Sequence, residues 1–154
     1  MGEGLKRRIR QTKFESTAQE AILNLLVASS HVRQLVDEVC AKYDITQAQF
    51  NALRILRGAH PEGYPRGEIA SRLIDRAPDV TRLIDRLEQR GLVERARSRA
   101  DRRLSITRIS RNGLQLLKRM DAPVRAINET FSQRIPAKDL KELSRICESV
   151  YADE

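Results

Sequence analysis

The sequence of 154 residues predicts a mainly α, α+β fold in which helical segments at both ends of the chain flank a smaller central lobe. Two patterns predict this fold. Apolar residues recur with the 3.6-residue period of an amphipathic helix near both ends of the chain. Between these ends, a helix with a basic outer face is followed at once by two short strands and a very basic turn.

The run Arg82–Arg111 carries most of the positive charge. It holds ten arginines and four acidic residues, a net charge of +6 out of +8 for the whole chain. An apolar stripe predicts a helix at the start of this run, formed by Val80, Leu83, Ile84 and Leu87. Gly91 is expected to end this helix. Two strands, Leu92-Val93 and Leu104–Ile109, flank a basic turn at 97–103. Helix and basic hairpin together predict a winged helix suited to a polyphosphate.

The segments before this run predict helices of different length. Met1–Lys13 contains five basic residues and is expected to be a frayed end, with a DNA-contacting arm as the alternative. A long uninterrupted helix is expected at Ser16–Lys42. Thr46 and Gln49 then have the spacing of a capping box, which predicts the start of a helix that ends at Gly58.

A loop rich in Gly and Pro follows at His60–Pro65. After it, a short helix is expected at about Arg66–Ile74, with four residues facing inward: Ile69, Ala70, Leu73 and Ile74. Pro78 suits the first turn of the next helix, because its missing N–H is not needed there. Only Asp75-Arg76-Ala77 connects these two helices, and two helices joined by so few residues have helix-turn-helix organisation.

The C-terminal part predicts two more amphipathic helices. Ser110 is a plausible N-cap for the first of them, and Pro123 is expected to kink this helix without ending it. The last helix is expected at Ala137–Val150. Together with the long N-terminal helix, these segments have more apolar helix face than one small lobe can cover. The excess predicts a homodimer.

The composition argues against several classes of protein. Cys40 and Cys147 lack metal-ligand spacing and indicate a reduced chain, with Cys40 expected to be an inert buried thiol. No apolar run approaches the ~20 residues of a membrane span, and no signal-peptide pattern is present, so a cytoplasmic protein without membrane contact is expected. Two histidines, no paired carboxylates and no Gly-rich phosphate loop argue against an enzyme and predict no cofactor and no metal.

The motifs in the basic run resemble those of the MarR family of transcriptional regulators. Val80–Glu88, followed by Arg90–Arg95, is similar to the recognition helix and first wing strand of that family. Asp101-Arg102-Arg103 resembles the wing motif, and Ile109-Ser110 stands where the family usually has Leu-Thr. The motifs cover roughly Asp44–Met120.

The resemblance implies a homodimer that represses transcription by binding a palindromic operator in double-stranded DNA. It also implies release by a small, often aromatic or phenolic, ligand. The whole chain, 1–154, is then one MarR-like domain, with dimerisation helices at 14–43 and 111–151 and the winged helix-turn-helix lobe at 45–110.

The candidate DNA-binding residues lie on the expected recognition helix and wing. On the helix, Thr81, Arg82 and Arg86 are expected to face the major groove, and Asp79 to cap the helix or accept from a cytosine amine. In the wing, the resemblance assigns minor-groove insertion to Arg103, with Asp101 holding its guanidinium. The other wing arginines are expected to contact phosphate: Arg97, Arg99 and Arg102.

The ligand candidates are polar residues of the long first helix or its end: His31, Arg33 and Tyr43. For each, an ordinary surface or core role is the alternative. Two functions compete with that of a ligand-controlled repressor. One is a winged-helix module that binds protein instead of DNA, and the other is a DNA-binding protein without a ligand. The arginine-dense wing disfavours the protein-binding module, because binding to a protein requires no such positive field.

Overall fold

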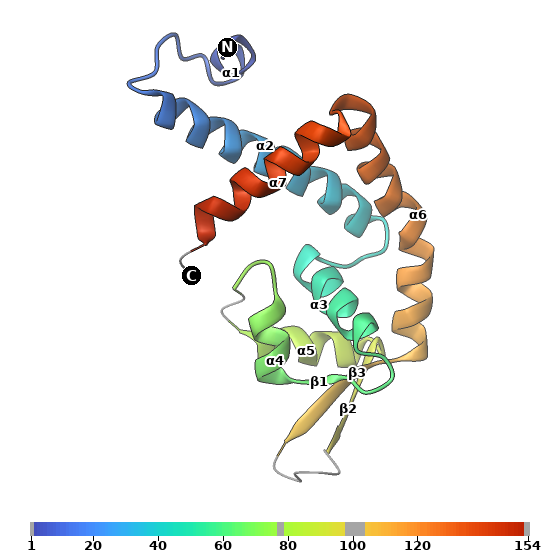
Figure 1. Cartoon of the computed structure of the whole chain (residues 1–154). Helices are drawn as coiled ribbons and strands as arrows, with labels where there is room; N and C mark the ends of the chain where they lie inside the picture. The colour runs from blue at the N-terminus through green and yellow to red at the C-terminus, as the bar shows by residue number, and fades with distance from the viewer. Residues whose placement is uncertain (1, 77–78, 98–103, 153–154) are drawn as a thin grey trace. The chain divides into compact units, whose positions relative to one another are not determined.

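The computed structural model of the protein describes residues 2–76, 79–97 and 104–152. The chain divides into two compact units, Met1–Glu38 and Val39–Glu154, and the boundary falls inside the second helix. Each unit is described by itself. Figure 1 labels the helices and strands in both.

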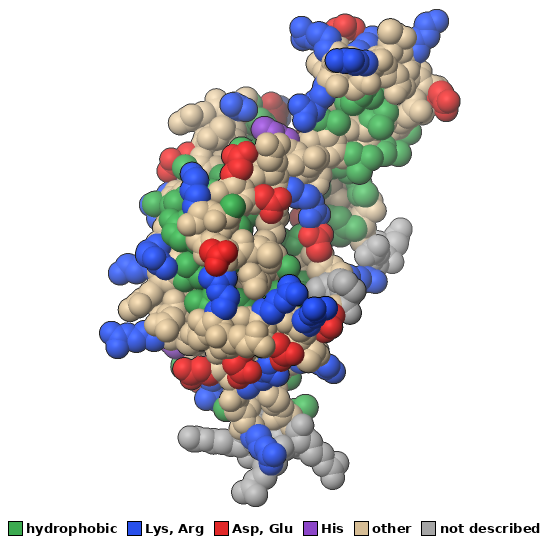
Figure 2. Space-filling model, turned by 180° about the vertical axis from the view of Figure 1, so that it is seen from behind, with side chains coloured by type: hydrophobic (Ala, Val, Ile, Leu, Met, Phe, Trp, Pro, Cys, Tyr) green, Lys and Arg blue, Asp and Glu red, His purple; other side chains and the backbone are tan. Residues whose placement is uncertain are grey.

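The first unit contains α1 (Glu3–Ile9) and most of α2 (Thr17–Ala41). The helix α1 corrects the expectation of a frayed basic end, because Leu5 is buried and so fixes one side of that helix. The long helix α2 begins and ends within one residue of its predicted bounds. Three large apolar side chains of α2 are exposed in the single chain: Ile22, Leu25 and Leu26. Hydrophobic side chains are visible at the surface of this unit in Figure 2.

The second unit is built around α3 (Gln47–Gly58), which contributes three fully buried side chains: Ala52, Leu53 and Leu56. The predicted capping box is confirmed. The amide of Gln49 donates to Thr46 Oγ1 at 3.2 Å, and the amide of Thr46 donates to Gln49 Oε1 at 2.9 Å. The helices α4 (Arg66–Arg72) and α5 (Val80–Gln89) pack against α3, and Ile69 of α4 and Leu87 of α5 are also fully buried.

The end of α4 differs from its prediction. Ile74 is 82% exposed, although an inward position was expected. The helix stops at Arg72, and Leu73 is already extended at φ −66° and ψ 137°, so the helical period no longer applies at Ile74. The amide of Ile74 instead donates to Asn51 Oδ1 at 2.9 Å. Pro78, expected in the first turn of α5, lies outside the described residues.

The sheet has three antiparallel strands in the order β1-β3-β2. The wing hairpin consists of β2 (Val93–Arg97) and β3 (Ser105–Ile109), and Figure 1 shows it projecting from the helices of this unit. The short strand β1 (Tyr64–Pro65) was expected to be loop and pairs with Thr107 and Ile106 of β3. A proline is tolerated there because β1 is an edge strand, where a missing N–H leaves no ladder bond unmade.

The C-terminal helices are α6 (Arg111–Arg134) and α7 (Ala137–Tyr151). Ser110 caps α6 as predicted, since its Oγ accepts from the amide of Gly113 at 3.1 Å. The helix continues through Pro123, so the expectation that this proline does not end it is confirmed. In the single chain no residue of α7 is buried, and its exposed apolar side chains include Leu143, Ile146 and Val150.

Candidate nucleic-acid interface

The helix α5 is held at both ends by local hydrogen bonds. Asp79 accepts from the amide of Arg82 at 2.9 Å, so the predicted capping role of its carboxylate is confirmed. At the other end Gly91 adopts φ +67° and its amide donates to Glu88 O at 2.8 Å. The amide of Leu92 donates to Leu87 O at 2.9 Å. This pair of bonds is a Schellman motif, and three residues separate the end of the helix from Val93, the first residue of the wing strand β2.

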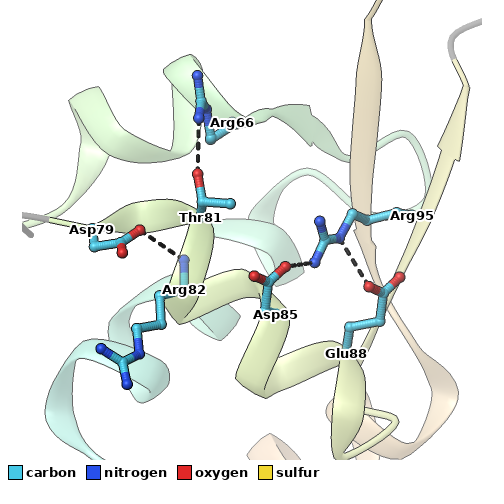
Figure 3. Close-up of polar contacts among 7 residues, drawn as sticks. All are labelled: Arg66, Asp79, Thr81, Arg82, Asp85, Glu88 and Arg95. Carbon is cyan, nitrogen blue, oxygen red and sulfur yellow. Dashed lines mark hydrogen bonds and ion pairs between the residues drawn. The ribbon is translucent and has the colours of Figure 1, made fainter.

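The two faces of α5 differ in burial. The inner face is formed by Leu83, Ile84 and Leu87, which are all buried. The opposite face carries Thr81, Arg82 and Arg86, and all three are exposed. Within the part of the chain that the structure describes, no ion pair involves Arg82 or Arg86. Figure 3 shows the Arg82 guanidinium directed away from the neighbouring polar side chains. These two cations are therefore available to an anionic partner.

Arg66 is a site residue that the sequence analysis did not single out. It is the first residue of α4, and its Nη1 donates to Thr81 Oγ1 at 2.8 Å (Figure 3). The bond joins the beginnings of the two helices of the helix-turn-helix. Fifteen residues separate the partners, so no local sequence signal indicates the contact. Both residues also line a crevice of about 370 Å³ at the root of the wing.

Arg95 ties the wing to the recognition helix. Its Nε lies 3.0 Å from Glu88 Oε2, and its Nη2 contacts Asp85 Oδ1 (Figure 3). This guanidinium offsets one of the two negative charges of these carboxylates, which would otherwise repel an anionic partner more strongly from the same surface. Arg72 is likewise engaged within the protein. A hydrogen bond from its side chain to Glu68 raises the pKa of Arg72, and its guanidinium lies over the Tyr64 ring at 4.6 Å.

Two further arginines of the basic run have partners within the protein. Arg90 contacts the carbonyl oxygen and, at 3.5 Å, the carboxylate of Asp44, and Arg108 Nε donates to Glu62 O at 2.9 Å. High local arginine content therefore overstates the number of cations free to bind phosphate. The sequence could not separate these arginines, because their partners come from distant segments of the chain.

The predicted wing contacts are described only in part. Arg97 is exposed at the end of β2 and pairs with Ser105 across the hairpin. The other predicted wing residues lie outside the described residues: Arg99, Asp101, Arg102 and Arg103. Their proposed contacts with DNA therefore rest on the sequence motif and on the position of the hairpin that carries them.

The predicted ligand residues fall in different units. His31 and Arg33 are exposed on α2 in the first unit, and Arg33 lines a shallow groove along that helix. Tyr43 belongs to the second unit, where it lines a crevice of about 670 Å³. Arg90, Lys118 and Arg119 supply the cations of this crevice. The Tyr43 hydroxyl already donates to Arg119 O at 3.0 Å, so its polar group has a structural partner.

Metal sites and membrane-spanning helices are absent from the described residues. In the ranges 2–76, 79–97 and 104–152, no group of three or more His, Cys, Asp or Glu side chains is placed to hold a metal ion. Cys40 is buried, as expected of a structural thiol, and Cys147 is partly exposed. None of the described helices has the length and apolar character that a membrane crossing requires.

Comparison with known proteins identifies the fold and the family. The model of the MarR family matches residues 45–105. A solved MarR transcription factor from Planctomyces limnophilus is 40% identical, with 88% of this chain and 98% of that chain covered and a TM-score of 0.67. The HTH-type transcriptional repressor IacR from Pseudomonas putida is 25% identical over 118 residues, which are 77% of this chain and 70% of IacR.

The repressor CouR has been solved in two complexes that resemble this chain. The CouR chain bound to a 23-mer DNA duplex is 26% identical to this chain. The match covers 92% of this chain and 99% of that chain, with a TM-score of 0.77. The CouR of Rhodococcus jostii RHA1 bound to p-coumaroyl-CoA is 20% identical to this chain, which shows a similarity of fold alone. The match covers 92% of this chain and 98% of that chain, with a TM-score of 0.73. The winged helix-turn-helix geometry and the 40% identity to the Planctomyces protein show that this chain belongs to the MarR family of DNA-binding transcriptional regulators.

Proposed function

We propose that the protein is a dimeric repressor that binds a palindromic operator and is released from it by a small aromatic or phenolic ligand. The observation that carries the DNA-binding part is the outer face of α5. There Arg82 and Arg86 are exposed and unpaired among the described residues, beside a projecting hairpin. A major groove accepts such a helix, and arginine can bond guanine O6 and N7 together.

The predicted residues then have distinct roles. Thr81, Arg82 and Arg86 address the major groove, while Asp79 orients the helix through its cap. Arg103, held by Asp101, enters the minor groove, and three wing arginines contact phosphate: Arg97, Arg99 and Arg102. The division of the chain follows the same roles, with 45–110 as the DNA-binding lobe and 14–43 and 111–151 as dimerisation helices. The exposed apolar faces of α2 and α7 support the dimer.

Ligand control is proposed on two grounds. CouR, which has this fold, has been solved with p-coumaroyl-CoA bound. In this chain, the crevice beside Tyr43 joins α6 to Arg90 and Leu92, which stand at the end of the recognition helix. A ligand that binds there can shift the helix, provided that it favours one position over the other. That His31 and Arg33 also line a ligand site stays a prediction.

A role as regulator, without catalysis, follows from this proposal, and the protein is expected to act in the cytoplasm where it meets its operator. The test is selection of bound sites from random double-stranded DNA by the full-length protein. We expect a two-fold symmetric sequence with half-sites about one turn (~10 bp) apart. Recovery of only asymmetric or random DNA would overturn the symmetric-repressor proposal, and the absence of any binding would favour a protein-binding module.

Variants then test the residues. Arg82→Ala should weaken binding to the selected site by about 5- to 150-fold for each half-site, because a good bidentate base contact is worth ~1–3 kcal/mol. Lys138→Ala on α7 removes the same charge from an exposed position and serves as the control. Arg103→Ala should weaken binding most where the flanks are A·T-rich, because a narrow minor groove attracts arginine. An equal loss of affinity on all flanks would mean that Arg103 contacts phosphate and does not enter the minor groove.

A further inference from the structure

The bond between Arg66 and Thr81 joins two exposed side chains at the start of the helix-turn-helix. Arg66 is the first residue of α4, and Thr81 is the second residue of α5. The Nη1···Oγ1 distance of 2.8 Å is that of a good hydrogen bond. The N-terminal residues of a recognition helix are those that reach base edges, so the pair stands where DNA is read.

The chemistry of the two groups fixes the direction of this bond. A guanidinium can only donate, so the Thr81 oxygen is the acceptor. The hydroxyl hydrogen must then point away from the cation. Without Arg66, the hydroxyl of Thr81 could rotate and either donate to or accept from a base. With Arg66 in place, one of the two lone pairs of this oxygen is used and the hydrogen points away from the cation, so the bond favours Thr81 as a donor.

The guanidinium keeps donors to spare. Arginine has five N–H groups, and the contact with Thr81 uses one of them. Arg72 on the same helix and Arg95 on the wing are both paired with carboxylates. Among the described residues no such carboxylate pairs with Arg66, which is exposed. Its remaining N–H groups can therefore bond an anionic oxygen, and on DNA that oxygen belongs to a phosphate.

We propose that Arg66 and Thr81 form one composite DNA contact, in which Arg66 bonds a backbone phosphate and sets Thr81 as a hydrogen-bond donor to a base. The bases that fit such a donor in the major groove are guanine, adenine and thymine, through N7, O6 or O4. Cytosine offers its amine there, which can reach only the remaining lone pair of Thr81 beside the Arg66 cation, so cytosine is disfavoured at this position. The inference rests on the proposed function, because it requires that α5 enters the groove.

The experiment compares variants of the full-length protein on the operator selected by the wild type, with each base placed in turn at every position. Arg66→Met should lower affinity by about 10- to 100-fold for each half-site, as for loss of one charged hydrogen bond in each. It should also reduce the slope of log affinity against log salt by about 2, about 1 for each of the two Arg66 side chains of the dimer. At one position per half-site, the penalty for cytosine should shrink, because the freed hydroxyl can accept from its amine.

Two further variants isolate the coupling. Thr81→Val should weaken the preference at the same operator position, and adding it to Arg66→Met should cost less than the product of the two single losses. Arg66→Lys should retain the salt slope, since it keeps the charge. Arg72→Met is the matched control on α4, because it removes a guanidinium that is already paired with Glu68. It should leave base preference unchanged.

The outcomes separate this inference from the proposed function. If the wild type selects no fixed sequence, the proposed function fails, and the inference fails with it. If the wild type binds its operator and Arg66→Met retains both the affinity and the cytosine penalty, only the composite contact is overturned. Circular dichroism and thermal unfolding of each variant identify any loss that is due to misfolding, and Arg66→Lys then provides the decisive comparison.

Discussion

The hydroxyl of Tyr43 donates a 3.0 Å hydrogen bond to the carbonyl oxygen of Arg119. That carbonyl lies four residues before Pro123, inside the long helix α6. In a regular helix it would accept from the amide of residue 123, but proline has no N–H. The chain between α2 and α3 therefore supplies the donor that the helix lacks, and a proline-containing helix continues without leaving this backbone oxygen unpaired.

This relationship predicts that Tyr43 and Pro123 are energetically coupled. Tyr43→Phe should lower the free energy of unfolding by about 0.5–1.5 kcal/mol, the net worth of one hydrogen bond. The loss should be smaller in a Pro123→Ala background, where residue 123 has its own N–H to donate. Urea unfolding of the four proteins measures the coupling. Tyr64→Phe is the control, because Tyr64 lies outside the proposed dimerisation helices and its hydroxyl makes no hydrogen bond among the described residues. Equal losses in both backgrounds would mean that the hydroxyl does not replace the missing donor.

Ser110 joins the end of the recognition helix to the start of α6. Its Oγ donates to Gly91 O at 2.6 Å and accepts from the amide of Gly113 at 3.1 Å, and the residue is buried. Ser110→Ala removes a cap and leaves Gly91 O without this donor. The free energy of unfolding should fall by about 1–3 kcal/mol. Ser132→Ala, on the exposed side of the same helix, should change it by less than about 0.5 kcal/mol in the same denaturant titration.

Substitution of Arg95 is expected to lower DNA affinity more than it lowers stability. Arg95→Met breaks two partly exposed ion pairs and should cost only about 0–1 kcal/mol of stability for each. It also restores the full charge of Asp85 and Glu88 near the phosphates, so operator affinity should fall more than stability does. Adding Asp85→Asn and Glu88→Gln should restore much of that affinity. Fluorescence anisotropy at low and high salt checks the mechanism, because repulsion weakens as salt is added. A loss that neither salt nor the two amides reduce would contradict it.

The exposed apolar stripe of α2 predicts that the protein assembles. Ile22 and Leu26 are 58% and 59% exposed in the single chain. Leu26→Glu places a charge in the proposed dimer interface, where burial without a partner is costly. Sedimentation velocity should show a shift from dimer to monomer, accompanied by weaker operator binding. Lys13→Glu, outside the stripe, is the control. A dimer unaffected by Leu26→Glu would place the interface elsewhere.

Much of the fold could be predicted from the sequence because its signals are local. The capping residues Thr46, Asp79 and Ser110 each accept from the amide three positions further on, and each forms the bond that its position in the sequence predicts. The period of Leu83, Ile84 and Leu87 identifies the buried face of α5, and Gly91 marks its end. Such features require only a few consecutive residues, so spacing is sufficient to predict them.

The sequence alone thus determined the winged-helix class, the position of the recognition helix and the face that it presents. Only the tertiary structure decided which polar groups meet across the chain. It pairs β1 with β3, turns Ile74 outward, ties Arg95 to α5 and sets Arg66 against Thr81. These contacts join residues far apart in sequence, or depend on where a helix stops. Packing selects them from many chemically equivalent partners, and no periodicity along the chain records that choice.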